Sequence, residues 1–566
     1  MPGYSLAPTN GGDELADESN SDGGLTTMSP TRRKKMAIET SDSRPSYKKK
    51  TSRELEMTPL SPGSDGVFER FDDEIGEDGL HVAQMRSTVL PLWFEDWLFP
   101  PHLPRQCQLL RVENIAVPAC YLLVGLLLGL SSPLINAYPI DLGASEAQQT
   151  SISAIRNLPA SFKLIFGFLS DSTPLMGYRR KSYMLRKSQL DATPSVPPDD
   201  APTMPFLSLC ALMAGMGLWL ADVMGDSIVA EKAKLEPPEY RGSIQSSCYA
   251  FRFFGSMIAV PLGTYLYSTL GPFYVVVLLA LLPLSIIPFV VTFNEIKDLP
   301  VAPIPEQCQE IFNTVCSRAV WQPLGFVWTY NILQVGNSAW KQFLRTNLGF
   351  TACQLNMMLV SAYILLYAGV LTYKYYMINW SWRKVYIVTT LLNGLFSILQ
   401  VLLIYGITFG LSPFLFAFGD DAFADFLGGV QFLPTTIMMV HLCPSGSEGA
   451  SYSMFTTVNN SAGTLSVAVS TMLLGIWDVS KKALENEELQ GLVNLTYLTT
   501  ALQVSGVFLV FLLPQYKEDL ERLKASKTGT SKIGGVIFLT ITFSSIAYAI
   551  AVGLLNIIAP GWMGES

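Results

Sequence analysis

The chain has 566 residues, of which 49% are hydrophobic and 15% charged, and its formal net charge is −8. Soluble domains carry about 25% charged residues, and apolar runs long enough to cross a hydrocarbon core of about 30 Å recur from residue 115 to the C-terminus. This composition excludes a soluble globular domain and predicts an all-α polytopic membrane protein embedded in a lipid bilayer.

Residues 1–100 are rich in Ser, Gly, Asp, Glu and Lys, and they are too polar to offset the entropy cost of folding. We predict a disordered cytosolic N-terminal tail. Its basic clusters, TRRKK at 31–35 and YKKK at 47–50, admit two readings, a solvated tail or a patch that binds anionic lipid.

Twelve apolar spans follow the tail. An N-terminal helical half covers 101–293, a central cytosolic linker 294–320, a C-terminal helical half 321–513, and a cytosolic segment with one further span 514–566. The predicted spans are 115–138, 147–169, 205–230, 243–267, 273–293, 321–338, 353–373, 385–409, 422–441, 450–476, 492–513 and 533–558.

The loop charges orient the chain, because cytosolic loops are enriched in Lys and Arg. Beyond residue 231, one alternating set of loops holds thirteen basic residues and the other set holds four, which places the first set and the N-terminus inside. Span 205–230 then has cytosol at both ends, because the basic residues 179–181 and 232–234 flank it. One crossing is therefore missing, and it is missing at 184–204.

Several motifs occur in order along the chain. They are NLPASFKLIFGFLSDSTPLMGYRRKSYM, ADVMGDSIVAEKA, RGSIQSSCYAFRFFG, FGDDAFADFLGGVQFLP and HLCPSGSEGASYS. Together they resemble the folate–biopterin transporter family of the major facilitator superfamily. The resemblance extends from about residue 115 to residue 513 and implies a major-facilitator-type helical bundle.

The chain departs from this family pattern after the second span. In the family, the tyrosine after the basic cluster opens the third helix, whereas here Tyr183 and Met184 are followed by LRKSQLDATPSVPPDD. We predict that the third helix is absent, that 184–204 is a loop, and that 533–558 is an extra C-terminal span. The chain is then either a shortened gene model or splice form, or a bundle with a vacant position.

Three ionisable residues are predicted near the membrane midplane. Counted from the cytosolic ends of their spans at 1.5 Å per residue, Lys163, Asp222 and Arg252 lie about 12, 15 and 16 Å deep. Residues at that depth usually face a cavity or one another. Two cations and one carboxylate favour an organic anion as the small substrate, and the resemblance implies a folate or pterin. The alternative is that Asp222 and Arg252 pair only to hold helices together.

In the second half the midplane positions carry amides, which could hydrogen-bond a pteridine ring or simply join helices. These residues are Asn331, Gln431, Asn459 and Asn460.

Further residues are predicted to couple or gate transport. Asp226 lies one helical turn from Asp222 and would either exchange protons or pair with the basic loop that contains Arg179 and Arg180. Asp171 would latch the cytosolic face. Three more carboxylates, including Asp421, are expected near the outer end of their span, in a structural or gating role, and the other two are Asp420 and Asp425.

No nucleotide-binding loop, catalytic triad or metal-ligand spacing is present in the sequence. We therefore expect no enzyme activity, cofactor, metal site or nucleic-acid partner, and the oligomeric state stays open. The leading hypothesis is a secondary active transporter of folates, pterins or related anions, possibly proton-coupled in its cycle, in the plasma membrane or an organelle membrane. The alternatives are a non-transporting membrane protein with a regulatory role and a transporter of an unrelated anion.

Overall fold

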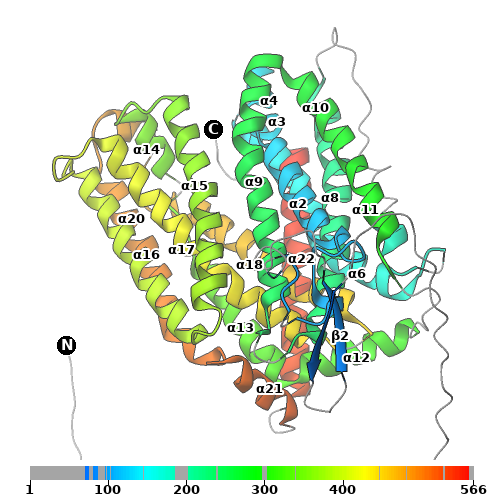
Figure 1. Cartoon of the computed structure of the whole chain (residues 1–566). Coiled ribbons are helices and arrows are strands. Elements are labelled where there is room, and N and C mark those ends of the chain that lie inside the picture. The colour runs from blue at the N-terminus through cyan, green and yellow to red at the C-terminus, as the bar shows by residue number, and fades with distance from the viewer. Residues whose placement is uncertain are drawn as a thin grey trace, which may run out of the picture. The chain divides into compact units, whose positions relative to one another are not determined.

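A computed structural model describes residues 70–75, 81–86 and 96–559, the last range with gaps at 97, 102, 144–145, 177, 185–201, 238–239, 296–302, 338, 445, 480 and 527–529. From residue 96 onward the described residues form a bundle of helices (Figure 1). The hypothesis of an all-α, polytopic membrane protein is confirmed for this part of the chain.

A small hairpin precedes the bundle. Two six-residue strands, β1 (Arg70–Ile75) and β2 (His81–Arg86), pair antiparallel with Arg70 opposite Arg86. The hairpin falls within 1–100, so the structure differs at these strands from the tail expected there. The backbone ladder between the strands satisfies donors and acceptors that an isolated polar segment would leave to water. Most of the remaining tail lies outside the described residues.

The N-terminal half contains helices that match the predicted spans, several of them broken. Its elements are η1 (Arg105–Cys107), α2 (Ala116–Leu130), α3 (Ser132–Asn136), α4 (Tyr138–Asp141), α5 (Glu146–Asn157), η2 (Leu158–Phe162), α6 (Lys163–Ser172), α8 (Met204–Lys232), η3 (Ala233–Leu235), α9 (Ser243–Leu270), α10 (Pro272–Leu281), η5 (Leu282–Ile286) and α11 (Ile287–Thr292).

The predicted span 147–169 is interrupted at its centre. Pro159 cannot donate a backbone hydrogen bond, so α5 ends and the chain passes through the 3-10 turn η2 before α6 begins at Lys163. The break places Lys163 at the start of a helix rather than in the middle of one.

The C-terminal half is built in the same way and is followed by two further helices. The linker and this half contain α12 (Ile304–Cys316), α13 (Arg318–Leu333), α14 (Trp340–Thr346), α15 (Ala352–Thr372), the π-helical η6 (Tyr373–Met377), α16 (Trp382–Ile404), α17 (Pro413–Leu442), α18 (Glu448–Leu473), α19 (Lys481–Glu485), α20 (Gln490–Ser505), η7 (Gly506–Leu512), α21 (Lys517–Ala525) and α22 (Lys532–Ile558).

Seven helical stretches in the described residues are long and apolar enough to cross a membrane. They are Ala116–Asp141, Met204–Leu235, Pro272–Thr292, Met357–Met377, Trp382–Ile404, Pro413–Leu442 and Gln490–Leu512. The other predicted spans also coincide with helices, which are interrupted, as α5 and α6 are, or contain more polar residues, as α9 and α18 do.

Close helix pairs make up the core of each half. In the first half α2 packs along α9, and a β-carbon on Gly125 would lie 1.9 Å from the backbone oxygen of Arg252. In the second half α15 packs along α17, and a β-carbon on Gly429 would lie 2.3 Å from the backbone oxygen of Leu366. Small residues of this kind let helix backbones approach closely inside membranes.

The two halves meet mainly where α6 and α8 pack against α18 and where α9 packs against α15. In Figure 1 the halves converge at the end that carries α12 and α21, and they diverge towards the end that carries α4 and α14. One continuous buried apolar cluster includes residues of α2, α8 and α9 from the first half and of α13, α17 and α18 from the second.

The loop predicted at 184–204 lies almost entirely outside the described residues. The prediction that the third helix is absent is therefore not tested by the structure. The ends of this stretch are nonetheless fixed. Arg180, four residues before Met184, pairs with Glu231 at the C-terminal end of α8. Because Glu231 is 27 residues beyond Met204 in α8, Met204 is about 40 Å from that ion pair. Met184 and Met204, which are described residues, therefore lie near opposite ends of α8.

Candidate functional site

Two buried charged residues and a partly buried arginine meet between α6, α8 and α9. The Lys163 Nζ atom lies 2.5 Å from one carboxylate oxygen of Asp222, and Arg252 Nη1 lies 2.5 Å from the other. Lys163 and Asp222 retain less than 5% of their exposure. The structure thus brings together the three ionisable residues predicted at one membrane depth, with Asp222 shared between two cations.

Asp226 lies one turn further along α8 in a different environment. Its Oδ1 atom accepts a hydrogen bond of 2.5 Å from the Tyr121 hydroxyl, and both side chains are almost fully buried. Asp226 is therefore held by a neutral donor, whereas the basic residues Arg179 and Arg180 pair elsewhere.

A cavity of about 510 Å³ lies beside this charged cluster. Its walls come from η2 and α8 of the first half, α13 and α18 of the second half, and α22. Among the described residues that line it, none is ionisable and most carry an amide or a hydroxyl group. Trp219 connects the cavity to the charges, because its ring lines the wall and lies 4.6 Å from Lys163 Nζ.

The four predicted midplane amides separate into two groups. Asn331, Asn459 and Asn460 line the cavity, and Asn331 donates to the Asn459 side chain at 2.6 Å. Gln431 instead donates to the hydroxyls of Tyr330 and Thr389 at 2.8 and 2.6 Å, within the second half. Two amides bonded to each other keep unused donors and acceptors that can face a ligand.

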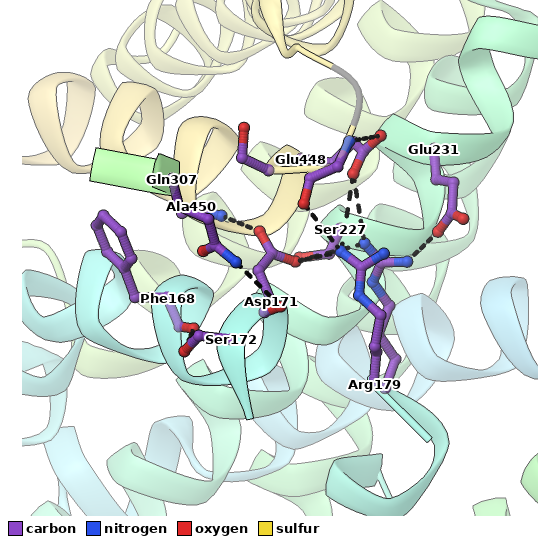
Figure 2. A network of polar contacts seen from close by, with 12 residues as sticks. Phe168, Asp171, Ser172, Arg179, Ser227, Glu231, Gln307, Glu448 and Ala450 are labelled. Carbon is purple, nitrogen blue, oxygen red and sulfur yellow. Dashed lines mark hydrogen bonds and ion pairs between the residues drawn. The ribbon is translucent and has the colours of Figure 1, made fainter. Parts of the chain in front are cut away.

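A second charged network joins the ends of the two halves that are predicted to face the cytosol (Figure 2). Arg179 lies 3.0 Å from Asp171 and 3.9 Å from Glu448, and Arg180 reaches the same two carboxylates at 3.6 and 3.9 Å. Lys234 pairs with Glu448 at 2.6 Å. Because Glu448 begins α18 and the other four residues belong to the first half, these ion pairs join the halves.

Asp171 also caps a helix of the opposite half. Its Oδ2 atom accepts a 2.8 Å hydrogen bond from the backbone N–H of Ala450, in the first turn of α18. A carboxylate at a helix N-terminus is stabilised by unpaired N–H groups and the helix dipole. Gly449 makes this approach possible, because a β-carbon there would lie 2.8 Å from the Asp171 carboxylate.

Two carboxylates of this network were not found by sequence reasoning. Glu295 accepts hydrogen bonds from the backbone N–H groups of Arg179, Arg180 and Lys181 at 3.0, 3.0 and 2.8 Å. Glu448 stands inside the quoted motif HLCPSGSEGASYS without having been assigned a role. The position of Glu448 at the start of a predicted helix could have indicated a role at the end of the bundle. The sequence around Glu295 gives no indication of its partners.

The three carboxylates of α17 lie away from this network. α17 begins at Pro413, nine residues before the predicted start at 422, because Asp420 and Asp421 interrupt the apolar run. Asp420 accepts from Gln400 at 2.7 Å, and the electrostatic neighbours of Asp421 are Asp425 and Lys341. At 1.5 Å per residue, Asp421 is about 30 Å from the cytosolic end of α17.

The loop between α8 and α9, which is predicted to be cytosolic, contains a buried carboxylate and contacts α21. Glu236 accepts from the backbone N–H groups of Gly242 and Ile244 at 2.7 and 2.6 Å, and burial raises the pKa of Glu236 to about 7. Lys517 of α21 donates to the backbone oxygen of Arg241, and burial lowers the pKa of Lys517 to about 8. The segment after the second half therefore docks on a loop of the first half.

The arrangement can bind and release a ligand from a polar cavity between two halves. In the part of the chain that the structure describes, no group of three or more His, Cys, Asp or Glu side chains could hold a metal ion.

Comparison with known proteins gives a consistent result. The model of the BT1 family matches residues 125–532. The chain is 25% identical over 428 residues to the folate-biopterin transporter of Synechocystis sp., covering 72% of this chain and 84% of that protein. It is 22% identical over 384 residues to folate transporter 1 of Plasmodium falciparum, covering 66% of this chain and 74% of that protein.

Solved structures with the same fold are transporters of the major facilitator superfamily. The proton:xylose symporter XylE superposes with a TM-score of 0.51 and 13% identity, covering 73% of this chain and 98% of the symporter. The human organic anion transporter MFSD10 superposes with a TM-score of 0.50 and 13% identity, covering 72% of this chain and all of that protein.

Proposed function

The chain belongs to the BT1 family and is an integral, multi-pass membrane transporter of the major-facilitator type, and from that premise we propose that it carries folates, pterins or related organic anions by alternating access. The curated relatives described above are named for folate or folate and biopterin, and this substrate class is transferred here as a proposal.

The observation that carries the proposal is the position of the cavity. It lies between the halves, its walls come from both of them, and it borders a buried cluster with two cations. Transporter substrate sites lie near the midplane at such an interface. A cavity reached alternately from either side needs walls that belong to parts moving against each other.

In this proposal Asp222 is a built-in counter-ion. It neutralises Lys163 and Arg252 while the cavity is empty, which limits the cost of burying two cations in a membrane. A substrate carboxylate then competes with Asp222 for the Arg252 guanidinium, which can hold a carboxylate through two parallel hydrogen bonds. Asn331, Asn459 and Asn460 contact the polar edge of the substrate, and Trp219 offers a flat aromatic surface. Gln431 supports that wall from behind.

Gating and coupling are assigned to the outlying charges. Asp171, Arg179 and Arg180 hold the cytosolic ends together in one state and separate in the other. Asp421 acts at the opposite end of the second half. Asp226, held by the Tyr121 hydroxyl beside the substrate cations, takes up and releases the coupling proton.

The test is uptake of radiolabelled folate in folate-requiring cells that express the parent chain or one of three variants. Arg252→Ala removes a charge-assisted contact of about 1.5–3 kcal/mol, so we expect uptake to fall about 10- to 100-fold. Arg252→Lys keeps the positive charge but cannot form two parallel hydrogen bonds, so its uptake should lie between that of the parent and that of Arg252→Ala. Arg318→Ala removes an exposed arginine that donates a hydrogen bond to the neighbouring Gln322 and should match the parent.

Surface abundance of each variant is measured in the same cells. Equal losses of Arg252→Ala protein and of uptake would make the cluster purely structural. No uptake by an abundant parent chain would support the non-transporting alternative. Inhibition of uptake by an unrelated organic anion, but not by unlabelled pterin, would overturn the substrate class.

A further inference from the structure

The last helix, α22, stands outside the part of the chain that matches the family. The match ends at residue 532 and α22 extends from Lys532 to Ile558. Its 27 residues give a length of about 40 Å, which is enough to cross a bilayer. Figure 1 shows it in red, running along the bundle, and it packs against α18.

α22 contacts both halves of the transporter. It packs against α5 and η2 of the first half, against α18 and α13 of the second half, and against the linker helix α12. Its start is fixed to α12, because the Ser531 N–H donates to the Cys316 backbone oxygen at 3.0 Å. A β-carbon on Gly535 would lie 2.6 Å from Cys316 Sγ and 3.2 Å from Cys316 Cα, so the two helices approach closely at this glycine.

The two faces of α22 differ in burial. Phe538, Thr542 and Ser545 are buried at spacings of three and four residues, which place them on one helical face. The opposite face is apolar and exposed, with Ile533, Val536, Ile537 and Phe543 each more than half exposed. A helix with one face on protein and an apolar face outward is suited to lie between a bundle and lipid.

Ile546 connects α22 to the transport cavity. It lines the cavity together with residues of η2, α8, α13 and α18. Ile546 is fourteen residues beyond Lys532, which is about 21 Å along the helix and close to half its length. α22 therefore reaches the cavity at the depth where its other walls contribute their side chains.

We propose that α22 is a wall of the substrate cavity, closing its lateral side between α5 and α18 against the lipid bilayer, and that Ile546 is the residue by which it contacts the contents of the cavity. The inference rests on the proposed function only for the identity of those contents. A polar cavity with an open lateral side would expose amides to hydrocarbon, where unsatisfied polar groups are costly. An apolar helix added at that place removes this exposure.

The wall is tested by thiol accessibility in the full chain reconstituted in lipid nanodiscs, where a charged methanethiosulfonate reagent reaches the mouths of the cavity but not the hydrocarbon. Ile546→Cys should react, and Ile537→Cys, on the lipid-facing side of the same helix, should not. Asn460→Cys on α18 marks the opposite wall and should react. The parent chain gives the background from its own cysteines.

Protection by folate then separates the two proposals. Protection of both Ile546→Cys and Asn460→Cys supports both of them. Reaction at both positions without protection keeps the wall and overturns the folate substrate. Protected Asn460→Cys with an unreactive Ile546→Cys, or equal reaction of Ile546→Cys and Ile537→Cys, overturns the wall.

Discussion

At the scale of single residues, the Asp171 side chain contacts both halves of the molecule. One carboxylate oxygen faces Arg179, and the other accepts the Ala450 N–H at the start of α18. A buried charge is tolerated only when it is paired and hydrogen-bonded, and these partners come from both halves. The full set of partners of Asp171 is therefore present only while these ends of the two halves are together.

We expect Asp171→Asn to weaken the closed cytosolic state. The amide keeps the shape but loses the charge for the arginines and the helix N-terminus, a loss of about 1.5–3 kcal/mol. This corresponds to roughly 10- to 100-fold in the ratio of closed to open molecules. Spin labels at Met176→Cys and Lys384→Cys, both exposed and in opposite halves, should report a longer cytosolic distance.

The control is Glu113→Gln. It breaks the ion pair with Arg105, whose side chain is 68% exposed, and exposed pairs contribute little, so the distance distribution should stay that of the parent. Unchanged distances in Asp171→Asn would remove Asp171 from the gate.

Residue counting from the sequence predicted the meeting of Lys163, Asp222 and Arg252, because all three lie on or at the end of regular helices with a fixed rise per residue. It did not predict Glu295 or Glu448. Their partners are more than a hundred residues away in the chain, and no periodic pattern reports such contacts.

At the scale of elements, the pairing of α6 with α18 is the tightest contact between the halves. A β-carbon on Gly167 would lie 2.5 Å from the backbone oxygen of Gly449. Because that obstacle is backbone, no side-chain rotation can relieve it, and the spacing of the two helices depends on glycine.

We expect Gly167→Ala to force α6 and α18 apart and to lower both uptake and the thermal unfolding temperature of the solubilised protein. Overpacking of this kind typically costs about 1–3 kcal/mol. Gly325→Ala in α13 is the matched control, since no atom lies within 4 Å of a β-carbon there. It should match the parent or be slightly more stable, because alanine favours helix. Equal behaviour of the two variants would contradict the close contact.

The length of the apolar runs predicted where helices occur, but it did not predict where those helices are interrupted or where they begin. The predicted span 147–169 was treated as one continuous helix, yet Pro159 divides it. The predicted start of α17 was too late because Asp420 and Asp421 lower the local hydropathy near the true start of the helix. In both cases one or two residues outweigh the average hydropathy of their neighbours.

At the scale of the whole molecule, the two halves are joined by ion pairs at one end and diverge at the other, which is the arrangement that the proposed alternating access requires. The charged cluster, the cavity and Asp226 lie between the ends, so a proton and a substrate can each bias the same equilibrium.

We expect uptake to rise as the external pH falls and to collapse with a protonophore, because a carboxyl that faces outward binds its proton more fully in acid. Asp226→Asn carries no exchangeable charge and should lose this pH dependence, whereas Asp519→Asn on the cytosolic helix α21 should keep it. Parent uptake that responds neither to pH nor to the protonophore would exclude proton coupling, whatever the substrate is.

The direction of α22 has a practical consequence for anyone who attaches a reporter to this protein. The helix starts beside α12 and passes the cavity and α5. Under the proposal that α22 crosses the bilayer as a wall of the cavity, Ile558 and α12 lie on opposite faces of the membrane. A fluorescent protein fused behind Ile558 is then translocated with it, while one fused ahead of the bundle stays on the side predicted to be cytosolic. Fusions at the two ends would thus report on different compartments.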